Sequence, residues 1–173
     1  MAFCSGENSR PKRFFDAQAA HIEPILEKEK TGLSVAFFAV ASDGTITVRK
    51  PNDYVSSMIE LAGGTYSLNG YVPEEENALS TLKMQMEDFY AAEKDADILI
   101  YNGTIEGELT SIDELVQKNS LFADFKAVKT GQVYTTGSNF YQQTSGTCDF
   151  IEDLNKVLNG ETDAEYRFLK KIN

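Results

Sequence analysis

The sequence predicts an α/β fold in which a mainly parallel sheet lies between two layers of helices. Two apolar runs, residues 33–41 and 98–101, have the composition of strands that are buried on both faces. Segments with a helical spacing of apolar residues alternate with the predicted strands, as in sheets joined by right-handed crossovers. With 173 residues, the chain is long enough for one domain with a sizeable core.

The first predicted element is a helix that proline interrupts. Residues 11–29 carry an apolar stripe with helical spacing, and Pro24 lies inside this stripe. Proline removes a hydrogen bond and crowds the preceding turn of a helix. We therefore expect either a kink near residues 21–23 or two successive helices.

A turn and a second helix follow the first apolar run. Residues 42–44 read Ser-Asp-Gly, which is typical of a turn into a second strand over residues 45–50. Asn52 or Asp53 is placed to cap the next helix, and Gly63 is suited to the left-handed residue that ends it.

The rest of the chain alternates between short strands and helices. We expect strands over residues 82–84, 98–101 and 132–135, and helices over residues 85–93, after the capping residue Ser111, over residues 141–158, and in a charged final segment that ends at Ile172. No internal repeat divides this alternation, which favours a single sheet.

Charge and cysteine content exclude several classes of partner. The formal net charge of -11 repels phosphate backbones, so nucleic acid is not an expected partner. Cys4 and Cys148 lie far apart and belong to no Cys/His cluster, which indicates two separate thiols. The acidic runs at 74–76 and 95–97 lack the spacing of metal ligands and are interpreted as solvated segments. We predict no metal site and no cofactor.

Catalytic patterns are also absent from the sequence. The chain has one histidine, His21, which lies in a charged segment near Pro24 and is interpreted as a surface residue. The sequence contains no nucleophile elbow, phosphate-binding loop or zinc-protease motif. We therefore predict no catalytic residue and no enzyme activity.

Membrane-spanning and export signals are not apparent either. No stretch approaches the roughly 20 apolar residues that a membrane span needs. The first residues lack the apolar core of a secretory signal. The chain as written is therefore expected to be soluble and to carry no export address.

Candidate binding residues follow three of the predicted strands. In open parallel sheets, ligands collect beyond the carboxyl ends of the strands. The segments in these positions are residues 49–51, 101–104 and 137–141. Arg49 and Lys50 have two interpretations, a solvated strand end or a clamp for an anionic ligand.

Three ordered segments resemble a known family. They are YVSSMIELAGG, MEDFYAAEKDADILIYNG and SIDELVQKNSLFADFKAVKTGQVYTT. This order is similar to the C-terminal lobe of the helix-linked substrate-binding proteins of ABC importers, which capture ferric siderophores, haem or corrinoids. The resemblance covers residues 33–158.

The resemblance implies a three-layer α/β/α lobe preceded by part of a long linking helix. Residues 1–30 would be the end of this helix, and residues 31–173 the C-terminal ligand-binding lobe. The N-terminal lobe, the export signal and the lipid-anchoring cysteine of the family have no counterpart in the sequence. The chain is then either a truncated lobe or a natural one-lobed relative, and its full-length parent would be extracytoplasmic and membrane-anchored.

The resemblance also implies positions for ligand and permease contacts. The family binds its ligand with loops beyond the strands, which here gives Arg49, Tyr101, Asn102, Asn139, Phe140 and Tyr141. Exposed aromatic rings would stack on the ligand, and Arg49 would meet its charge. The alternative for each residue is a place in the core, above all for Tyr101, whose strand is buried. Glu87 matches the glutamate that engages permease arginines, although an acid at a helix start also has a purely electrostatic explanation.

Three hypotheses follow for the function. The first is the substrate-binding component of an importer for an iron-siderophore, haem or corrinoid ligand. The alternative is a stand-alone, one-lobed interaction domain with no transport role. For this chain in general, the exposed surface that normally meets the missing lobe could drive self-association. A chelatase-like enzyme is the third and lacks a catalytic histidine.

Overall fold

A computed structural model describes residues 20, 22–72, 79–138, 140, 146–161 and 165–173. The strands are β1 (Ser34–Val40), β2 (Ile46–Arg49), β3 (Thr65–Tyr66), β4 (Thr81–Met84), β5 (Ile98–Tyr101), β6 (Val133–Thr136) and β7 (Leu169–Lys171). The helices are α2 (Tyr54–Leu61), α3 (Met86–Glu93), α4 (Gly103–Glu106), α5 (Ile112–Lys118), α6 (Lys126–Lys129), α7 (Thr147–Leu158) and the 3-10 helix η1 (Ser120–Asp124).

The strands form one sheet with the order β4-β2-β1-β5-β6-β7, and β3 pairs with the start of β1. β1 is parallel to β3 and β5, and β5 is parallel to β6. β2 is antiparallel to both β1 and β4, and β7 is antiparallel to β6. Therefore β1, β3, β4, β5 and β6 point in the same direction, which confirms the predicted mainly parallel sheet.

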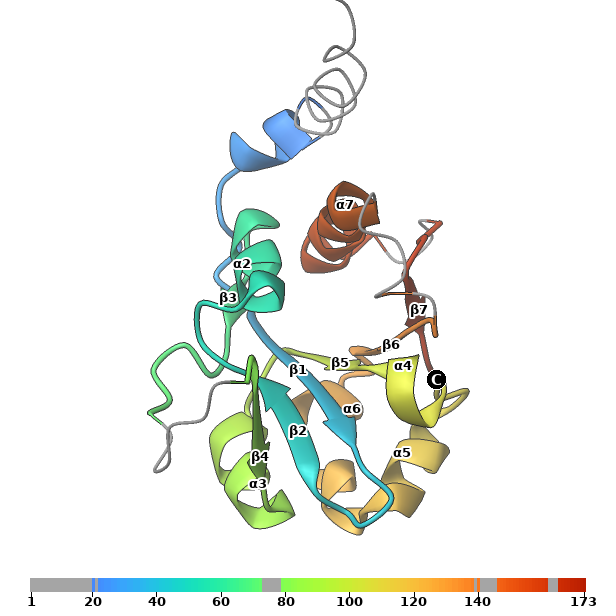
Figure 1. Cartoon of the computed structure of the whole chain (residues 1–173). Coiled ribbons are helices and arrows are strands. Elements are labelled where there is room, and N and C mark those ends of the chain that lie inside the picture. Colours follow the sequence, from blue (N-terminus) through green and yellow to red (C-terminus); the bar gives the residue numbers. More distant parts are fainter. Residues whose placement is uncertain (1–19, 21, 73–78, 139, 141–145, 162–164) are drawn as a thin grey trace, which may run out of the picture.

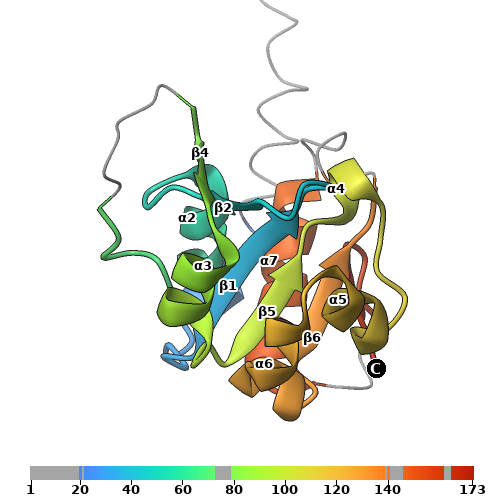
Figure 2. The ribbon, with the colours of Figure 1, turned by 90° about the horizontal axis from the view of Figure 1, so that it is seen from below.

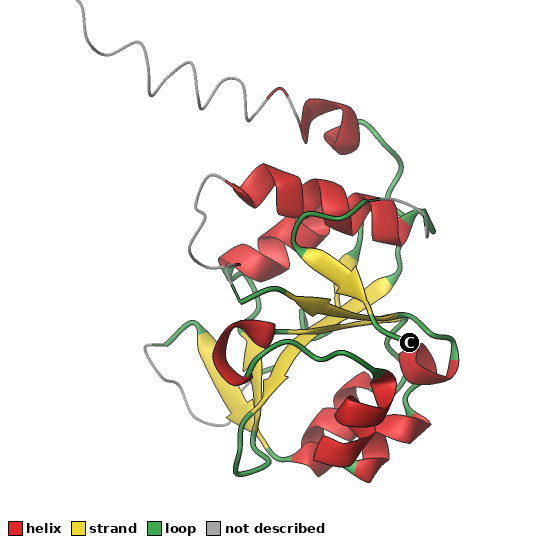
Figure 3. Cartoon of the chain, turned by 90° about the vertical axis from the view of Figure 1, so that its right-hand side faces the viewer, coloured by secondary structure: helices red, strands yellow, loops and turns green. Residues whose placement is uncertain are grey.

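Helices cover both faces of this sheet. α2 and α7 lie on one face, and α3, α5 and α6 lie on the other (Figures 1 and 3). β1 sends successive rings to opposite faces, because side chains alternate along a strand. Phe37 lies 6.0 Å from Phe140 on the α7 side, whereas Phe38 packs 5.0 Å from Phe89 on the α3 side. The predicted α/β/α layers are therefore present.

The N-terminal helix is only partly described. Residues 22–26 are helical and include Pro24. Residues 11–19 and His21 lie outside the described residues, so the expected kink stays a prediction. After this helix, Thr31 donates from its backbone N–H to the carbonyl oxygen of Gly63 at 2.9 Å, which joins the segment to the end of α2.

The predicted ends of several helices are confirmed. Asp53 takes the N-cap position of α2, but its side chain makes no capping hydrogen bond. Gly63 has a φ of 97°, as expected for the left-handed residue after this helix. Ser111 caps α5 by accepting a hydrogen bond from the N–H of Glu114 at 3.3 Å. Among the described helices, none is both long and apolar enough to cross a membrane.

The prediction of a charged final helix is wrong. Residues 169–171 form β7, which pairs with the outer edge of β6. Phe168, Leu169 and Ile172 are buried, and the charged Lys170 between them is exposed. A strand satisfies this backbone because the open edge of β6 offers hydrogen-bonding groups, and this partner is not visible in the local sequence.

Asp153 anchors β7 to the rest of the lobe. Its Oδ2 atom, on α7, accepts hydrogen bonds from the backbone N–H groups of Arg167 (2.8 Å), Phe168 (2.7 Å) and Leu169 (3.2 Å). Asp149, one turn earlier on the same helix, contacts only the exposed side chain of Arg167 in this segment, at 2.6 Å. Asp153 thus makes buried hydrogen bonds to this segment, whereas Asp149 makes an exposed ion pair with it.

These two aspartates provide a matched test. We expect Asp153→Ala to lower the free energy of unfolding by about 2–4 kcal/mol, because it leaves buried N–H groups without an acceptor. Asp149→Ala should cost about 1 kcal/mol or less, because the pair that it breaks is exposed. Urea denaturation followed by circular dichroism measures both. Equal losses in the two variants would contradict the anchoring role of Asp153.

Candidate ligand-binding site

A cavity of about 60 Å³ lies on the α2/α7 face of the sheet, next to the carboxyl end of β5. Its lining includes Phe37, Ala39, Arg49, Thr81, Asn102 and Ile105. These residues belong to β1, β2, β4 and the start of α4. Figure 2 shows α4 beyond the carboxyl ends of β1 and β5.

The alternation of side chains along the strands explains this convergence. Phe37 and Ala39 project from the same face of β1 because they are two residues apart. Arg49 pairs with Thr81 of β4, and its neighbour Val48 pairs with Phe38 of β1. Arg49 therefore lies beside Phe37 in the sheet, and both side chains reach the cavity.

Arg49 is the last residue of β2 and lines the cavity. β2 is not one of the parallel strands, because it runs antiparallel to β1. The turn at Ser42–Gly44 is too short for a crossover, since only an antiparallel hairpin can be closed by so few residues. Arg49 reaches the cavity because β2 is short and ends beside the middle of β1.

Arg49 is held by a network at the start of α2. Only 9% of the residue is exposed. Its guanidinium donates to Ser80 Oγ and to Tyr54 Oη, both at 3.2 Å, and forms an ion pair with Asp53 at 3.4 Å. The Tyr54 ring also lies 5.0 Å from Arg49 Cζ, within the range of a cation–π contact. Arg49 is thus ordered within the protein and is not a solvated strand end.

Asn102 and Ile105 form the second wall of the cavity, and Gly103 lies between them at the start of α4. Asn102 Oδ1 accepts hydrogen bonds from the Thr104 N–H (3.3 Å) and hydroxyl (2.7 Å), which caps α4. A Cβ atom on Gly103 would lie 2.4 Å from the Thr136 carbonyl oxygen, so only glycine fits there. This turn directs α4 over the sheet and leaves Ile105 72% exposed at the cavity rim.

The other predicted site residues have different surroundings. Phe140 is buried and packs 4.5 Å from Phe150 as well as against Phe37, so it supports the cavity wall. Tyr101 is fully buried on the opposite face, 5.8 Å from Phe38, and the structure does not bring it to the cavity. Asn139 and Tyr141 lie outside the described residues.

Sequence reasoning missed Tyr54, Ile105 and Phe37. Phe37 and Ala39 lie on one face of β1, because residues two apart in a strand point the same way. This period could have grouped the two residues in the sequence. Tyr54 looks like a core residue of α2 by its helical spacing, but it is half exposed beside Arg49. Ile105 belongs to a four-residue helix, which is too short to produce a periodic signal.

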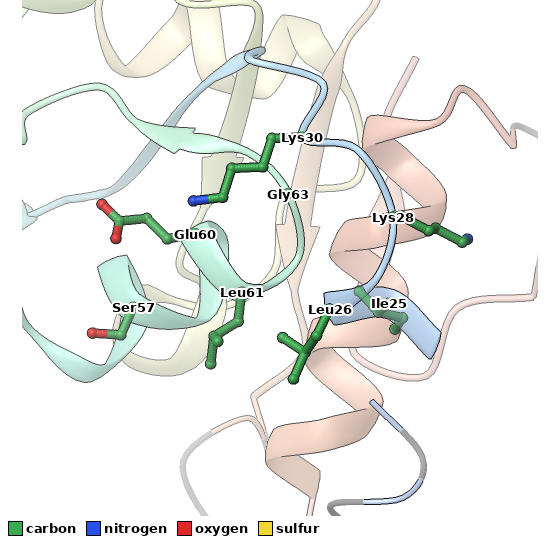
Figure 4. A pocket seen from close by; sticks show the side chains of 8 residues that line it. All are labelled: Ile25, Leu26, Lys28, Lys30, Ser57, Glu60, Leu61 and Gly63. Atoms are coloured by element: carbon green, nitrogen blue, oxygen red, sulfur yellow. The ribbon is translucent and has the colours of Figure 1, made fainter. Parts of the chain in front are cut away.

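A second and larger cavity lies away from the carboxyl ends of the strands. It measures about 330 Å³ and lies between residues 25–30 and α2 (Figure 4). Leu26 and Leu61 extend toward it, and both are exposed. Within the described residues, no group of histidine, cysteine and acidic side chains is placed to hold a metal ion.

A buried acid lies close behind the Arg49 site. Glu93 ends α3 and is 1% exposed. Neither carboxyl oxygen has a hydrogen-bond partner among the described residues, and the nearby Ser67 hydroxyl donates instead to Val35 O at 2.9 Å. Burial raises the pKa of Glu93 to about 7. The same burial, together with Glu93, raises the pKa of Tyr66, whose hydroxyl donates to Arg49 O at 2.7 Å.

The mainly parallel sheet, with helices on both faces and a cavity at the ends of its strands, has a three-layer α/β/α arrangement. No protein-family model matches the sequence, and no curated protein shows significant similarity to it. Solved structures do match. The TroA-like periplasmic binding protein FepB from Veillonella parvula is 13% identical, with a TM-score of 0.66 over 94% of this chain and 56% of that one.

Two further structures show the same similarity. The siderophore periplasmic binding protein from the fuscachelin gene cluster of Thermobifida fusca is 18% identical, with a TM-score of 0.63 over 90% of this chain and 55% of its own. The ABC-type Fe3+-hydroxamate transport system protein from Saccharomonospora viridis is 14% identical, with a TM-score of 0.67 over 84% of this chain and 48% of its own. The predicted resemblance is confirmed for the fold, and the chain spans about half the length of these structures.

Glu93 makes the stability of the lobe depend on pH. Its pKa is raised from 4.5 to about 7, so the folded state keeps a proton that the unfolded chain loses. The free energy of unfolding should therefore fall as pH rises from about 4.5 to about 7, by up to about 3 kcal/mol in total, and stay level above this range.

Replacing the acid isolates this effect. Glu93→Gln should remove the decrease in the free energy of unfolding between about pH 4.5 and 7. At about pH 8 the variant should be more stable than the parent, because no charge is then buried. Urea denaturation at several pH values measures it, with the exposed Glu87→Gln on the same helix as the control. A fall that persists unchanged in Glu93→Gln would rule out Glu93 as its source.

Proposed function

We propose that this chain is the C-terminal lobe of the substrate-binding component of an ABC importer for an iron-siderophore, haem or corrinoid ligand. The main support is the cavity beside the carboxyl ends of the parallel strands, where Arg49, Asn102 and Ile105 meet. The fold that it shares with siderophore and Fe3+-hydroxamate binding proteins agrees with this assignment.

The proposed site needs a second lobe to enclose a ligand. The cavity of about 60 Å³ is far smaller than the roughly 300–1,000 Å³ of ordinary ligand pockets. In the proposal, residues 1–30 are the end of the linking helix and an N-terminal lobe closes over the cavity. The lobe alone would bind weakly, with a dissociation constant of about 1 mM, because half a cleft buries little ligand surface.

The proposed importer role also assigns a surface for the permease. Glu87 is exposed in the first turn of α3, on the sheet face opposite α2 and α7. An exposed carboxylate in this position is available for paired hydrogen bonds with permease arginines. The parent protein would then be extracytoplasmic and anchored to the membrane.

The second candidate is a stand-alone interaction domain without a transport role. The observation that favours it is the 330 Å³ cavity, which exposed Leu26 and Leu61 flank. Exposed apolar groups around a hollow are typical of protein contacts. Concentration-dependent light scattering of the parent and Leu61→Glu would reveal self-association through this surface.

The two cavities can be distinguished by one matched pair of variants. We expect Ile105→Glu to weaken binding of a ferric siderophore by about tenfold, because the carboxylate must lose water against the ligand. Leu61→Glu, at the other cavity, should leave binding unchanged. Titration calorimetry measures both.

Two results would overturn the proposal. One is loss of binding in Leu61→Glu alone, which would move the site to the other cavity. The second is the absence of binding by the parent chain to ferric siderophores, haem and cobalamin at millimolar concentration. Tight binding by the parent chain would retain the site but contradict its dependence on a second lobe.

A further inference from the structure

The positive charge in the cavity is balanced within the protein. The Arg49 guanidinium and the Asp53 carboxylate lie 3.4 Å apart, and their side chains are only 11% and 8% exposed. At the distance of a ligand, such a pair acts as a dipole, because the fields of the two charges largely cancel. An anionic ligand would therefore gain little from Arg49 unless Asp53 moved away.

Among the residues that the structure describes, the cavity lining holds no second cation. Of the described residues that line the cavity, Arg49 alone is charged; the others are apolar or carry a hydroxyl or amide group. Beyond α4, a shallow depression of about 340 Å³ is lined by Glu106, Glu108 and Glu114 against one cation, Lys118. The field at the rim is therefore negative, in a chain whose formal net charge is -11.

The exposed residue in the described cavity lining is apolar. Ile105 is 72% exposed at the rim, and Tyr54, which is not part of the lining but contacts Arg49, is 48% exposed. Exposed large apolar side chains that gather at a cavity are typical of a binding surface. They favour a ligand whose outer surface is itself apolar.

We propose that this lobe selects an uncharged metal complex with an apolar periphery and discriminates against anionic ones, an inference that rests on the proposed binding function. Three hydroxamate groups, each with one negative charge, neutralise Fe3+ completely. Three catecholate groups, each with two negative charges, leave a complex with three negative charges. The lobe therefore fits the tris-hydroxamate class and disfavours the tris-catecholate class.

The test compares these two classes on the whole 173-residue chain. Gallium(III) has the charge of Fe3+ and is diamagnetic, so its tris-hydroxamate and tris-catecholate complexes can be titrated while the backbone amide signals of the labelled protein are observed by NMR. We expect both complexes to shift signals around Asn102 and Ile105. The dissociation constant of the neutral complex should be at least about fivefold lower than that of the trianion.

A charge variant then tests the cause. Asp53→Asn removes the carboxylate that lies 3.4 Å from the Arg49 guanidinium and should raise the affinity for the trianion by about fivefold at low salt, with little change for the neutral complex. Asparagine is well tolerated at an N-cap, so α2 should persist. Asp88→Asn on α3 changes the net charge equally at a distance and should alter neither affinity.

The outcomes separate the two levels of the proposal. If neither gallium complex shifts the cavity signals, the proposed siderophore-binding function fails. If both bind and the trianion binds as tightly as the neutral complex, the function stands and the charge selection fails. An equal gain in Asp53→Asn and Asp88→Asn would show that net charge, and not the Arg49–Asp53 pair, sets the preference, which would also overturn this inference.

Discussion

The burial of β1 on both faces is the constraint on which the rest of the lobe depends. Phe37 and Phe38 point in opposite directions, so the strand requires apolar cover on each side. α7 and Phe140 supply this cover on one face, and α3 with η1 supplies it on the other. Polar side chains are then accommodated at the ends of the strands, where the cavity lies.

This constraint also explains why a cation can be kept in the cavity. Arg49 is largely removed from water, and an isolated buried charge would be costly. The hairpin brings β2 beside β1, and the start of α2 follows after only a few residues, so Asp53 falls within reach of the guanidinium. The same sequence neighbours that stabilise Arg49 therefore also cancel its charge toward a ligand.

The sequence predicted the elements whose signal is local. β5 was predicted with its observed bounds, because an apolar run between polar segments needs no knowledge of the partner strands. β7 could not be predicted, since its strand conformation depends on the free edge of β6 and on the Asp153 carboxylate. Local periodicity instead suggested a helix for these residues.

Part of the candidate site could also be predicted from the sequence. Asn102 follows a strand whose carboxyl end is a ligand position in parallel sheets, and the structure places it in the lining of the cavity. The rule failed for Tyr101, because the two-residue period turns alternate side chains to the opposite face. The place of Ile105 at the cavity and the pairing of Arg49 with Asp53 depend on the tertiary structure, which the spacing of residues in the sequence does not reveal.

Glu93 and the cavity are close in space but separate in their effects. Glu93 influences Tyr66, whose hydroxyl donates to the Arg49 carbonyl oxygen. The guanidinium itself donates to Ser80 and Tyr54 and pairs with Asp53. The pH dependence of stability should consequently be separable from the charge preference of the site. A lobe in which Glu93→Gln altered the selection between neutral and anionic complexes would have a connection through Tyr66 that these contacts do not provide.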